Sequence, residues 1–222
     1  MTLRLYYHPF SSFCQKVLIA LHEREVAFEP VVVDLGDADQ RAALQALWPL
    51  AKFPVLCDQA RALTVPESSA IILHLDQAWP GAPLVPADPD AALRAHIWDR
   101  FCDNYVMAPM QKAVADHLRP AGHGDPYGVA EAKALLDQSY KMLDAKLAEA
   151  GDGWLAGGDF SLADCAAAPA LFYANIIMPF AGRRRLEAYY ERLLARPSFA
   201  RAVDEARPYR DLFPLEWPET YR

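Results

Sequence analysis

The sequence predicts a two-part protein, with an α/β domain at the N-terminus and an all-helical domain after it. Strand and helix patterns alternate over the first 80 residues. A proline-rich segment at 81–88 interrupts these patterns. Beyond it, apolar residues recur with the spacing of helices. We therefore expect domains at residues 1–80 and 89–222, joined by a linker at 81–88.

The N-terminal patterns have the order βαβ followed by ββα, which is the order of a thioredoxin-like layer of strands between helices. The expected elements are a strand at 3–7, a helix at 14–23, a strand at 27–34, a short helix at 39–47, hairpin strands at 54–57 and 62–64, and a helix at 67–79. The run of valines at 31–33 favours an interior position for its strand. In the last helix, Ile71, Ile72 and Leu75 should face the core.

Helix signals begin the second domain. Asp88 is placed to cap a helix that has Pro89 in its first turn. An apolar stripe in this helix is expected at Leu93, Ile97, Phe101 and Tyr105. A second helix at 129–149 repeats the pattern at Leu136, Tyr140, Leu143 and Leu147. Two shorter helices are expected at 184–195 and 198–205, before a tail at 207–222 that carries Tyr209, Phe213, Trp217 and Tyr221.

The segment at 165–182 carries no charge and approaches the length of a membrane span. It is rich in alanine and contains Pro169 and Pro179, so we interpret it as a helix buried in the helical domain. Just before it, Ser161 and Asp164 have the spacing of a capping box. We expect these two residues to be structural.

Charge and cysteine content exclude several classes of protein. The formal net charge is −7, so no excess of Lys and Arg exists to displace counterions from nucleic acid. The four cysteines are Cys14, Cys57, Cys102 and Cys165. Their spacing fits neither a metal site nor a disulfide framework. With no basic, apolar leader at Met1, they indicate reduced thiols in a cytoplasmic protein. We expect no metal and no nucleic-acid or membrane partner.

Ser11 and Ser12 lie where the first strand ends and the first helix begins. Unpaired amides and the positive end of the helix dipole favour an anion at such a place. Ser11 and Cys14 have the spacing of a redox CxxC motif, but the first position is a hydroxyl. No disulfide can form between them, so any thiol chemistry here needs a sulfur from a bound molecule.

Four motifs carry a resemblance to one family. They are Ser11-x-x-Cys14, Lys52-Phe53-Pro54-Val55-Leu56, Pro66-Glu67-Ser68-Ser69-Ala70-Ile71 and Phe160-Ser161-Leu162-Ala163-Asp164. In this order and spacing the chain resembles the cytosolic glutathione S-transferases over essentially its whole length. The resemblance implies glutathione as co-substrate, attack of its thiolate on a small electrophile, and a homodimer.

Ser11 resembles the catalytic serine of the theta-, delta- and zeta-like members of that family, which donates a hydrogen bond to the glutathione thiolate. Ser12 can replace it after a small shift of the turn. Two further alternatives stay open. Tyr7 lies where the tyrosine-type members carry their catalytic phenol, and Cys14 lies at a helix start, where thiol pKa values are lowered.

The resemblance also implies a set of glutathione-binding residues. Pro54 is a cis proline in the family, and the residue before it, here Phe53, offers its backbone to the cysteinyl part of glutathione. Lys52 resembles lysines that pair with the glycine carboxylate. Glu67 and Ser68 open a helix whose amides and hydroxyl can hold the γ-glutamyl carboxylate, while the Glu accepts from its ammonium.

Asp103 resembles an acidic residue that reaches the glutathione amino group across the dimer interface. The second-substrate pocket is expected between the domains, where clefts commonly form. Candidate walls are Phe10, Tyr105, Met107 and Met110.

Two other functions stay open at this point. The same thiolate can reduce a disulfide or peroxide, isomerise a substrate or remove a halide. Some relatives, such as the stringent starvation proteins and the elongation-factor gamma subunits, use the fold as an interaction module. Relatives of that kind tend to lose the glutathione-binding residues, whereas this chain keeps Ser11, Glu67 and Ser68.

Overall fold

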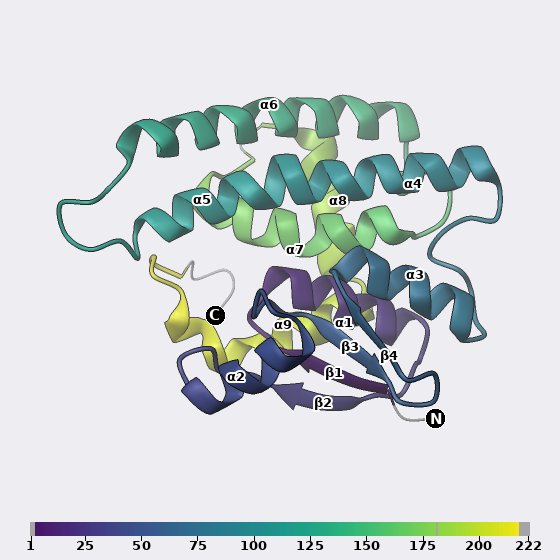
Figure 1. Ribbon diagram of the computed structural model, residues 1–222. Coiled ribbons are helices and arrows are strands. Elements are labelled where there is room, and N and C mark those ends of the chain that lie inside the picture. Colours follow the sequence, from purple (N-terminus) through teal and green to yellow (C-terminus); the bar gives the residue numbers. More distant parts are fainter. Residues whose placement is uncertain (1–2, 181, 218–222) are drawn as a thin grey trace.

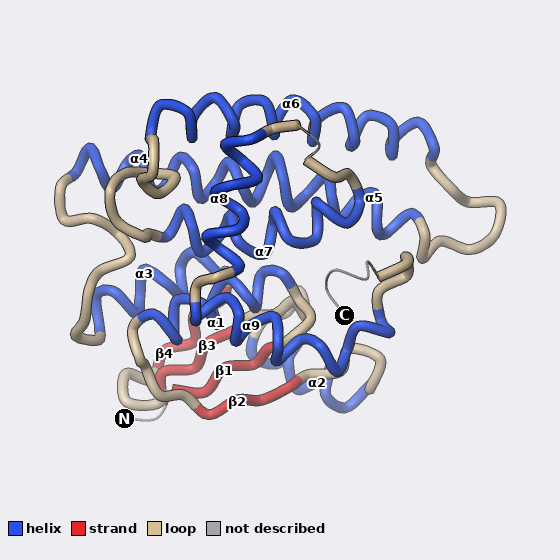
Figure 2. Tube along the Cα trace, turned by 180° about the vertical axis from the view of Figure 1, so that it is seen from behind, coloured by secondary structure: helices blue, strands red, loops and turns tan. Residues whose placement is uncertain are grey.

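The computed structural model describes residues 3–180 and 182–217, and it shows a small sheet packed against a larger set of helices (Figure 1). In these residues the sheet consists of β1 (Leu3–Tyr7), β2 (Glu29–Val32), β3 (Val55–Asp58) and β4 (Leu63–Pro66), in the spatial order β2-β1-β3-β4 (Figure 2). β1 is parallel to β2 and antiparallel to β3, and β3 is antiparallel to β4. The predicted thioredoxin-like fold is confirmed.

Helices cover both faces of the sheet. α1 (Ser12–Glu23) and α3 (Ser68–Ala78) pack on one face and α2 (Ala38–Leu47) on the other. This follows from alternation along β1, because successive side chains of a strand point to opposite faces. Leu5 lies in the large core with α1 and α3, whereas Tyr6 packs on the α2 side.

β2 is an edge strand, so the interior position predicted from its valines is wrong. The strand is also shorter than expected: Val32 is 43% exposed, and Val33, which is buried against α2, lies just beyond it. Pro30 lies within β2, where an edge strand tolerates it because an outward N–H needs no ladder partner. The hairpin of β3 and β4 and the buried face of α3 are confirmed.

The helices of the second domain follow in the described residues beyond α3. They are α4 (Pro89–Phe101), the π-helix η1 (Cys102–Met107), α5 (Ala108–Asp116), α6 (Pro126–Ala150), α7 (Leu162–Ile177), α8 (Arg184–Leu194), α9 (Pro197–Ala206) and the 3-10 helix η2 (Arg207–Leu212). α7 is the predicted buried helix, and it packs against α1, α4, α5 and α8. Among the described residues, no helix combines the length and the apolar character that crossing a membrane requires.

The start of α4 is confirmed, but most of its predicted apolar stripe is wrong. Asp88 caps the helix by accepting a 2.8 Å hydrogen bond from the N–H of Ala91. Leu93, Ile97 and Tyr105 are 58%, 53% and 47% exposed. The buried residues of α4 and η1 instead include Ala95, Asp99, Phe101, Cys102 and Val106. η1 continues α4 without a break and leads into α5, a helix that was not predicted.

The capping box at the start of α7 is confirmed as a structural feature. The N–H and the hydroxyl of Ser161 donate to Asp164 Oδ2 at 2.9 and 3.0 Å. Asp164 Oδ1 accepts from the Leu155 N–H at 3.0 Å and from the Tyr189 hydroxyl at 2.6 Å. Four donors therefore satisfy a carboxylate that is completely buried.

The segment between α3 and α4 is held in place, because the Asp76 carboxylate accepts from the N–H groups of Leu84 and Val85 at 3.2 and 2.7 Å. After α9 the tail passes between α2 and α5 in both views (Figures 1 and 2). Of the aromatic residues predicted there, Tyr221 lies outside the described residues.

Candidate functional site

The strand register brings three connecting segments to one edge of the sheet. Tyr6 near the end of β1 pairs with Val55 at the start of β3, and Val55 also pairs with Pro66 at the end of β4. The segments that follow β1, precede β3 and follow β4 therefore lie side by side. They carry most of the predicted site residues, namely Ser11, Ser12, Lys52, Phe53, Pro54, Glu67 and Ser68.

Ser11 is the N-cap of α1. Its Oγ accepts a 3.5 Å hydrogen bond from the N–H of Cys14, and its own N–H donates to the carbonyl oxygen of His8 at 3.0 Å. A capping side chain acts as an acceptor, so the hydroxyl proton is not used by the cap. Ser11 can therefore cap the helix and donate to an anion in front of it at the same time.

A cavity of about 480 Å³ opens beside Ser11 and Ser12. Its other walls come from the turn before α1, from α5, α7 and the tail, and they are Phe10, Met110, Gln111, Val114, Ala115, Leu118, Tyr173, Leu212, Phe213 and Pro214. No Asp, Glu, Lys, Arg or His is among these lining residues. The cavity therefore suits an uncharged, mainly apolar molecule.

Of the residues predicted to line a substrate pocket, Phe10 and Met110 lie on this cavity. Tyr105 and Met107 do not, which corrects that part of the prediction. Met107 is completely buried in the core, and Tyr105 is half-exposed on η1. A π-helix rotates less per residue than an α-helix, so α-helical spacing does not predict which side chains of η1 face the cavity.

Neither alternative to the serines has a suitable setting. Cys14 is completely buried, and burial raises the pKa of its thiol to about 12, so the thiol is not ionised at neutral pH. Tyr7 lines a separate cavity of about 770 Å³ together with Arg201, Glu205 and Tyr209. Burial also raises the pKa of the Tyr7 phenol. Both interpretations are therefore unsupported.

The peptide bond between Phe53 and Pro54 is cis, as the resemblance implies. Phe53 precedes β3, and its ring stacks on that of His8 with the centroids 6.2 Å apart. His8 also supplies the carbonyl that accepts from the Ser11 N–H. The segment before β3 and the turn before α1 are therefore in direct contact through His8. Lys52 is exposed and has no ion-pair partner within the described part of the chain.

The start of α3 has an unusual backbone. Glu67 has a φ of 71°, in the left-handed region that a non-glycine residue rarely adopts, and its exposed side chain makes no capping hydrogen bond. Ser68, the first residue of α3, is 6% exposed. The first amides of the helix and the Ser68 hydroxyl are thus available to an anion, and local strain of this kind is common at functional sites.

Asp103 is 5% exposed, so it is not a solvated surface charge. Its Oδ2 accepts from Lys16 Nζ at 2.8 Å and also bonds to Arg100. Its Oδ1 is buried without a hydrogen-bond partner among residues 3–180 and 182–217. Burial raises the pKa of the Asp103 carboxyl, and the Lys16 ammonium opposes that rise. In the same residues, no group of His, Cys, Asp and Glu side chains is placed to hold a metal ion.

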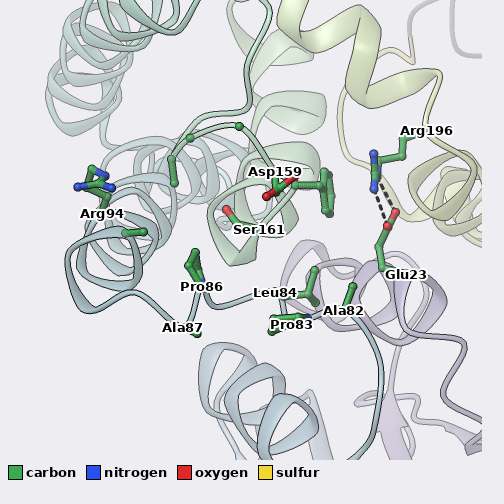
Figure 3. Close-up of a pocket in the computed structure, with 15 residues that line it drawn as sticks. Glu23, Ala82, Pro83, Leu84, Pro86, Ala87, Arg94, Asp159, Ser161 and Arg196 are labelled. Atoms are coloured by element: carbon green, nitrogen blue, oxygen red, sulfur yellow. Dashed lines mark hydrogen bonds and ion pairs between the residues drawn. The ribbon is translucent and has the colours of Figure 1, made fainter.

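A further cavity, of about 670 Å³, lies between the linker, α4 and the loop before α7 (Figure 3). The ion pair of Glu23 and Arg196, 2.6 Å between Oε1 and Nε, lies at one end, and Arg94 lies at the other. This cavity shares no lining residue with the one beside Ser11, so we do not include it in the candidate site.

Lys16, Gln111 and Tyr173 were not predicted to belong to the site. Lys16 carries a signal in the sequence, because it is a charge within the apolar helix after Cys14. Gln111 and Tyr173 carry none, since their position depends on how α5 and α7 pack against the turn before Ser11.

Comparisons with known proteins agree with this geometry. A model of the glutathione S-transferase N-terminal domain matches residues 5–83, and a model of the C-terminal domain matches residues 126–192. Glutathione S-transferase 3 of Zea mays is 32% identical over 210 residues, which cover 90% of this chain and 93% of the relative. A probable maleylacetoacetate isomerase of Vibrio cholerae is 26% identical over 225 residues, covering 94% and 98%.

Among solved structures, a glutathione S-transferase from Methylobacillus flagellatus with bound glutathione has a TM-score of 0.82 and 25% identity, covering 90% of this chain and 98% of that one. The fold, the cis Phe53–Pro54 bond and the serine at the start of α1 define a glutathione-dependent class of protein. The chain belongs to the cytosolic glutathione S-transferase superfamily.

Proposed function

We propose that the protein binds glutathione in front of Ser11 and catalyses attack of its thiolate on a neutral, apolar electrophile. One observation carries this proposal: the Ser11 residue at the start of α1 lines a cavity whose walls bear no charged side chain. Family membership supports the use of glutathione, and the composition of the cavity supports the class of electrophile.

The Ser11 hydroxyl and the N-terminus of α1 together can stabilise a thiolate enough to activate the thiol. A free thiol has a pKa of about 8.5, so only a few per cent is thiolate at neutral pH. Lowering that pKa by about two units requires roughly 2.7 kcal/mol of preference for the anion. A hydrogen bond to a charged acceptor contributes about 1.5–3 kcal/mol, and a helix N-terminus adds about 0.3–1 kcal/mol. Together these two interactions are sufficient.

The remaining parts of glutathione have matching groups around Ser11. We assign the cysteinyl backbone to Phe53, before the cis Pro54. The γ-glutamyl carboxylate fits the amides and hydroxyl at Ser68, and its ammonium fits Glu67. Asp103 is assigned to the same ammonium across the dimer interface, as the resemblance implies. The exposed Lys52 is assigned to the glycine carboxylate.

A second candidate is isomerisation, because a relative from V. cholerae is a probable maleylacetoacetate isomerase. Maleylacetoacetate is a dicarboxylate, and a buried carboxylate requires cationic or hydrogen-bonding partners. The cavity beside Ser11 provides no Lys, Arg or His for this purpose. We therefore favour transfer to a neutral electrophile over isomerisation of a diacid.

We also infer that the protein is a homodimer. Leu93, Ile97 and Tyr105 expose about half of their surface along α4 and η1, and contiguous exposed apolar residues are typical of interfaces. Light scattering of the purified protein tests this inference, with a dimer mass expected. A monomer at all concentrations would contradict it.

The proposed activity is tested with two electrophiles in parallel, a neutral aryl halide and a carboxylated analogue of the same halide. We expect glutathione to bind in calorimetry and the neutral halide to be conjugated faster by at least about tenfold, because a buried unpaired carboxylate costs more than 1.4 kcal/mol. Absence of glutathione binding at millimolar concentration would overturn the proposal. Equal rates for both electrophiles would overturn the assignment of the electrophile class.

A further inference from the structure

Lys16 is a completely buried cation behind the proposed glutathione site. It lies on α1, and its side chain is 0% exposed. Its Nζ donates hydrogen bonds to Ser69 Oγ at 2.9 Å and to Asp103 Oδ2 at 2.8 Å, and it forms an ion pair with Asp99 Oδ1 at 2.5 Å. An ammonium group has three donors, and here two of them make hydrogen bonds while the positive charge faces Asp99 as well.

The partners of Lys16 come from three different elements. Ser69 lies in the first turn of α3, directly after Ser68, while Asp99 and Asp103 belong to α4 and η1. Lys16 itself lies just over one turn from Ser11, the N-cap of α1. Its ammonium therefore connects the helix start assigned to the thiolate with the helix start assigned to the γ-glutamyl group.

The charges around Lys16 are balanced within the protein. Arg100 bonds to Ser69 Oγ at 2.9 Å, to Asp99 and to Asp103, so two cations face two carboxylates. Burying such a group seldom stabilises a fold more than well-packed apolar side chains of the same volume. What a buried ammonium held by three partners does provide is a fixed geometry between the elements that it joins.

The geometry points to Lys16 as a positioning residue for glutathione, which holds the first turn of α3 at a fixed place relative to the start of α1. This inference rests on the proposed function, because glutathione must span both helix starts at once. Lys16 does not touch the ligand; it acts through Ser69, the residue before it and Asp103. Its loss should weaken binding of the tripeptide backbone without changing the ionisation of the thiol.

The chain contains a matched control at the opposite ends of the same two helices. Arg24, the C-cap of α1, forms an ion pair with Asp76 near the end of α3 at 2.9 Å, and the side chains are only 1% and 9% exposed. Lys16→Met and Arg24→Met therefore each remove a buried cation that joins α1 to α3. Only Lys16→Met removes a cation that lies beside the proposed glutathione site.

The experiment measures glutathione and S-methylglutathione binding by calorimetry, and the pKa of the bound thiol from the ultraviolet absorbance of the thiolate. For Lys16→Met we expect both dissociation constants to rise by about tenfold, because misplaced binding groups lose that much. The thiol pKa should be unchanged. Arg24→Met should unfold at lower denaturant concentration and bind both ligands as tightly as the wild-type protein.

Ser69→Ala provides a second variant that folds even if Lys16→Met does not, because it removes only a hydroxyl. We expect it to raise both dissociation constants about threefold, again without a change in thiol pKa. Wild-type affinity in a folded Lys16→Met or in Ser69→Ala would overturn the inference. If Arg24→Met raised both dissociation constants as much as Lys16→Met, the inference would also be overturned, since the effect would then come from general destabilisation of the contact between α1 and α3. If the wild-type protein fails to bind glutathione, the proposed function fails first.

Discussion

The hydroxyl of Tyr173 in α7 donates a 2.9 Å hydrogen bond to the carbonyl oxygen of Phe10, in the turn that precedes Ser11. The same hydroxyl accepts from Gln15 Nε2 at 3.1 Å, and that amide also donates to the Pro9 carbonyl at 3.1 Å. Burial raises the pKa of the Tyr173 phenol, so it remains a neutral donor. The helical domain therefore fixes the turn that presents the proposed catalytic serine.

Tyr173→Phe should lower both stability and turnover. We expect the free energy of unfolding to fall by about 1–3 kcal/mol, because a buried carbonyl and a buried amide each lose a partner. Turnover should fall by up to about tenfold as Ser11 becomes less well placed. Tyr140→Phe is the control, since its hydroxyl bonds to the Met178 carbonyl at 3.2 Å away from the cavity. Equal loss of turnover in both variants would contradict the prediction.

Ser11→Ala should raise the pKa of bound glutathione by about 1–2 units, because a hydrogen bond of about 1.5–3 kcal/mol to the thiolate is lost. The thiolate is the reactive form, so the pH profile of kcat/KM should move to higher pH. The loss of rate should be greatest near pH 6 and should disappear as the pH rises above the new pKa.

Two controls accompany this measurement. Asp88→Ala removes the N-cap of α4, so it reports the stability cost of losing a cap without touching the site. Ser12→Ala tests the neighbouring hydroxyl. If Ser12→Ala shifts the pH profile and Ser11→Ala does not, the assignment of the two serines is reversed.

Gln111→Arg should change the choice of electrophile. Gln111 lines the cavity beside Ser11, and a guanidinium there can pair with a substrate carboxylate. We expect kcat/KM for a carboxylated aryl halide to rise about fivefold relative to the neutral halide, because a partly exposed pair contributes about 1 kcal/mol. Gln138→Arg on α6 adds the same charge outside the cavity and should leave this ratio unchanged.

The sequence predicted the helix starts of the fold and of the site, because these depend only on neighbouring residues. Ser11, Ser68 and Asp88 lie at helix starts, and a helix start is marked by a few adjacent residues. The cis bond before Pro54 came from the family resemblance, since nothing in the neighbouring residues requires it.

The remaining features depend on packing between distant elements. The valines at 31–33 are equally compatible with an edge and an interior strand, because Val33, just after the edge strand β2, is still buried against α2. Leu93 and Ile97 have the spacing of a core stripe but lie on an exposed face. Lys16 is marked in the sequence only as a charge within an apolar helix, because its carboxylate partners come from α4 and η1, far along the chain.

Cysteine labelling separates the proposed mechanism from one that uses a protein thiol. Cys57 is the partly exposed cysteine, whereas Cys14, Cys102 and Cys165 are buried and their thiol pKa values are raised by burial. An alkylating reagent at neutral pH should therefore modify Cys57 first in the folded protein, without loss of conjugating activity. If the reagent modified Cys14, and if bound glutathione prevented that modification, the assignment of the catalytic role to a serine would be contradicted.

The contact between α1 and α9 should make stability depend on acid pH. Glu205 accepts from Arg201 at 2.9 Å, and its Oε1 lies 3.6 Å from His22 Nε2. The nearby His22 imidazole, and then Arg201, lower the pKa of the Glu205 carboxyl below its ordinary value of 4.5. A lowered pKa in the folded state means that the ionised carboxylate stabilises the fold above about pH 4.5. That contribution is lost as the pH falls through the lower, folded-state pKa.

Glu205→Gln should therefore be less stable than the wild-type protein at pH 7, and the difference should shrink as the pH falls below the ordinary pKa of 4.5. Urea unfolding at a series of pH values measures this difference directly. Asp204→Asn is the control, because its carboxylate is 68% exposed where it pairs with Arg207, and exposed pairs contribute little. A difference between Glu205→Gln and wild type that grows toward low pH would show that the carboxylate is not held ionised between α1 and α9.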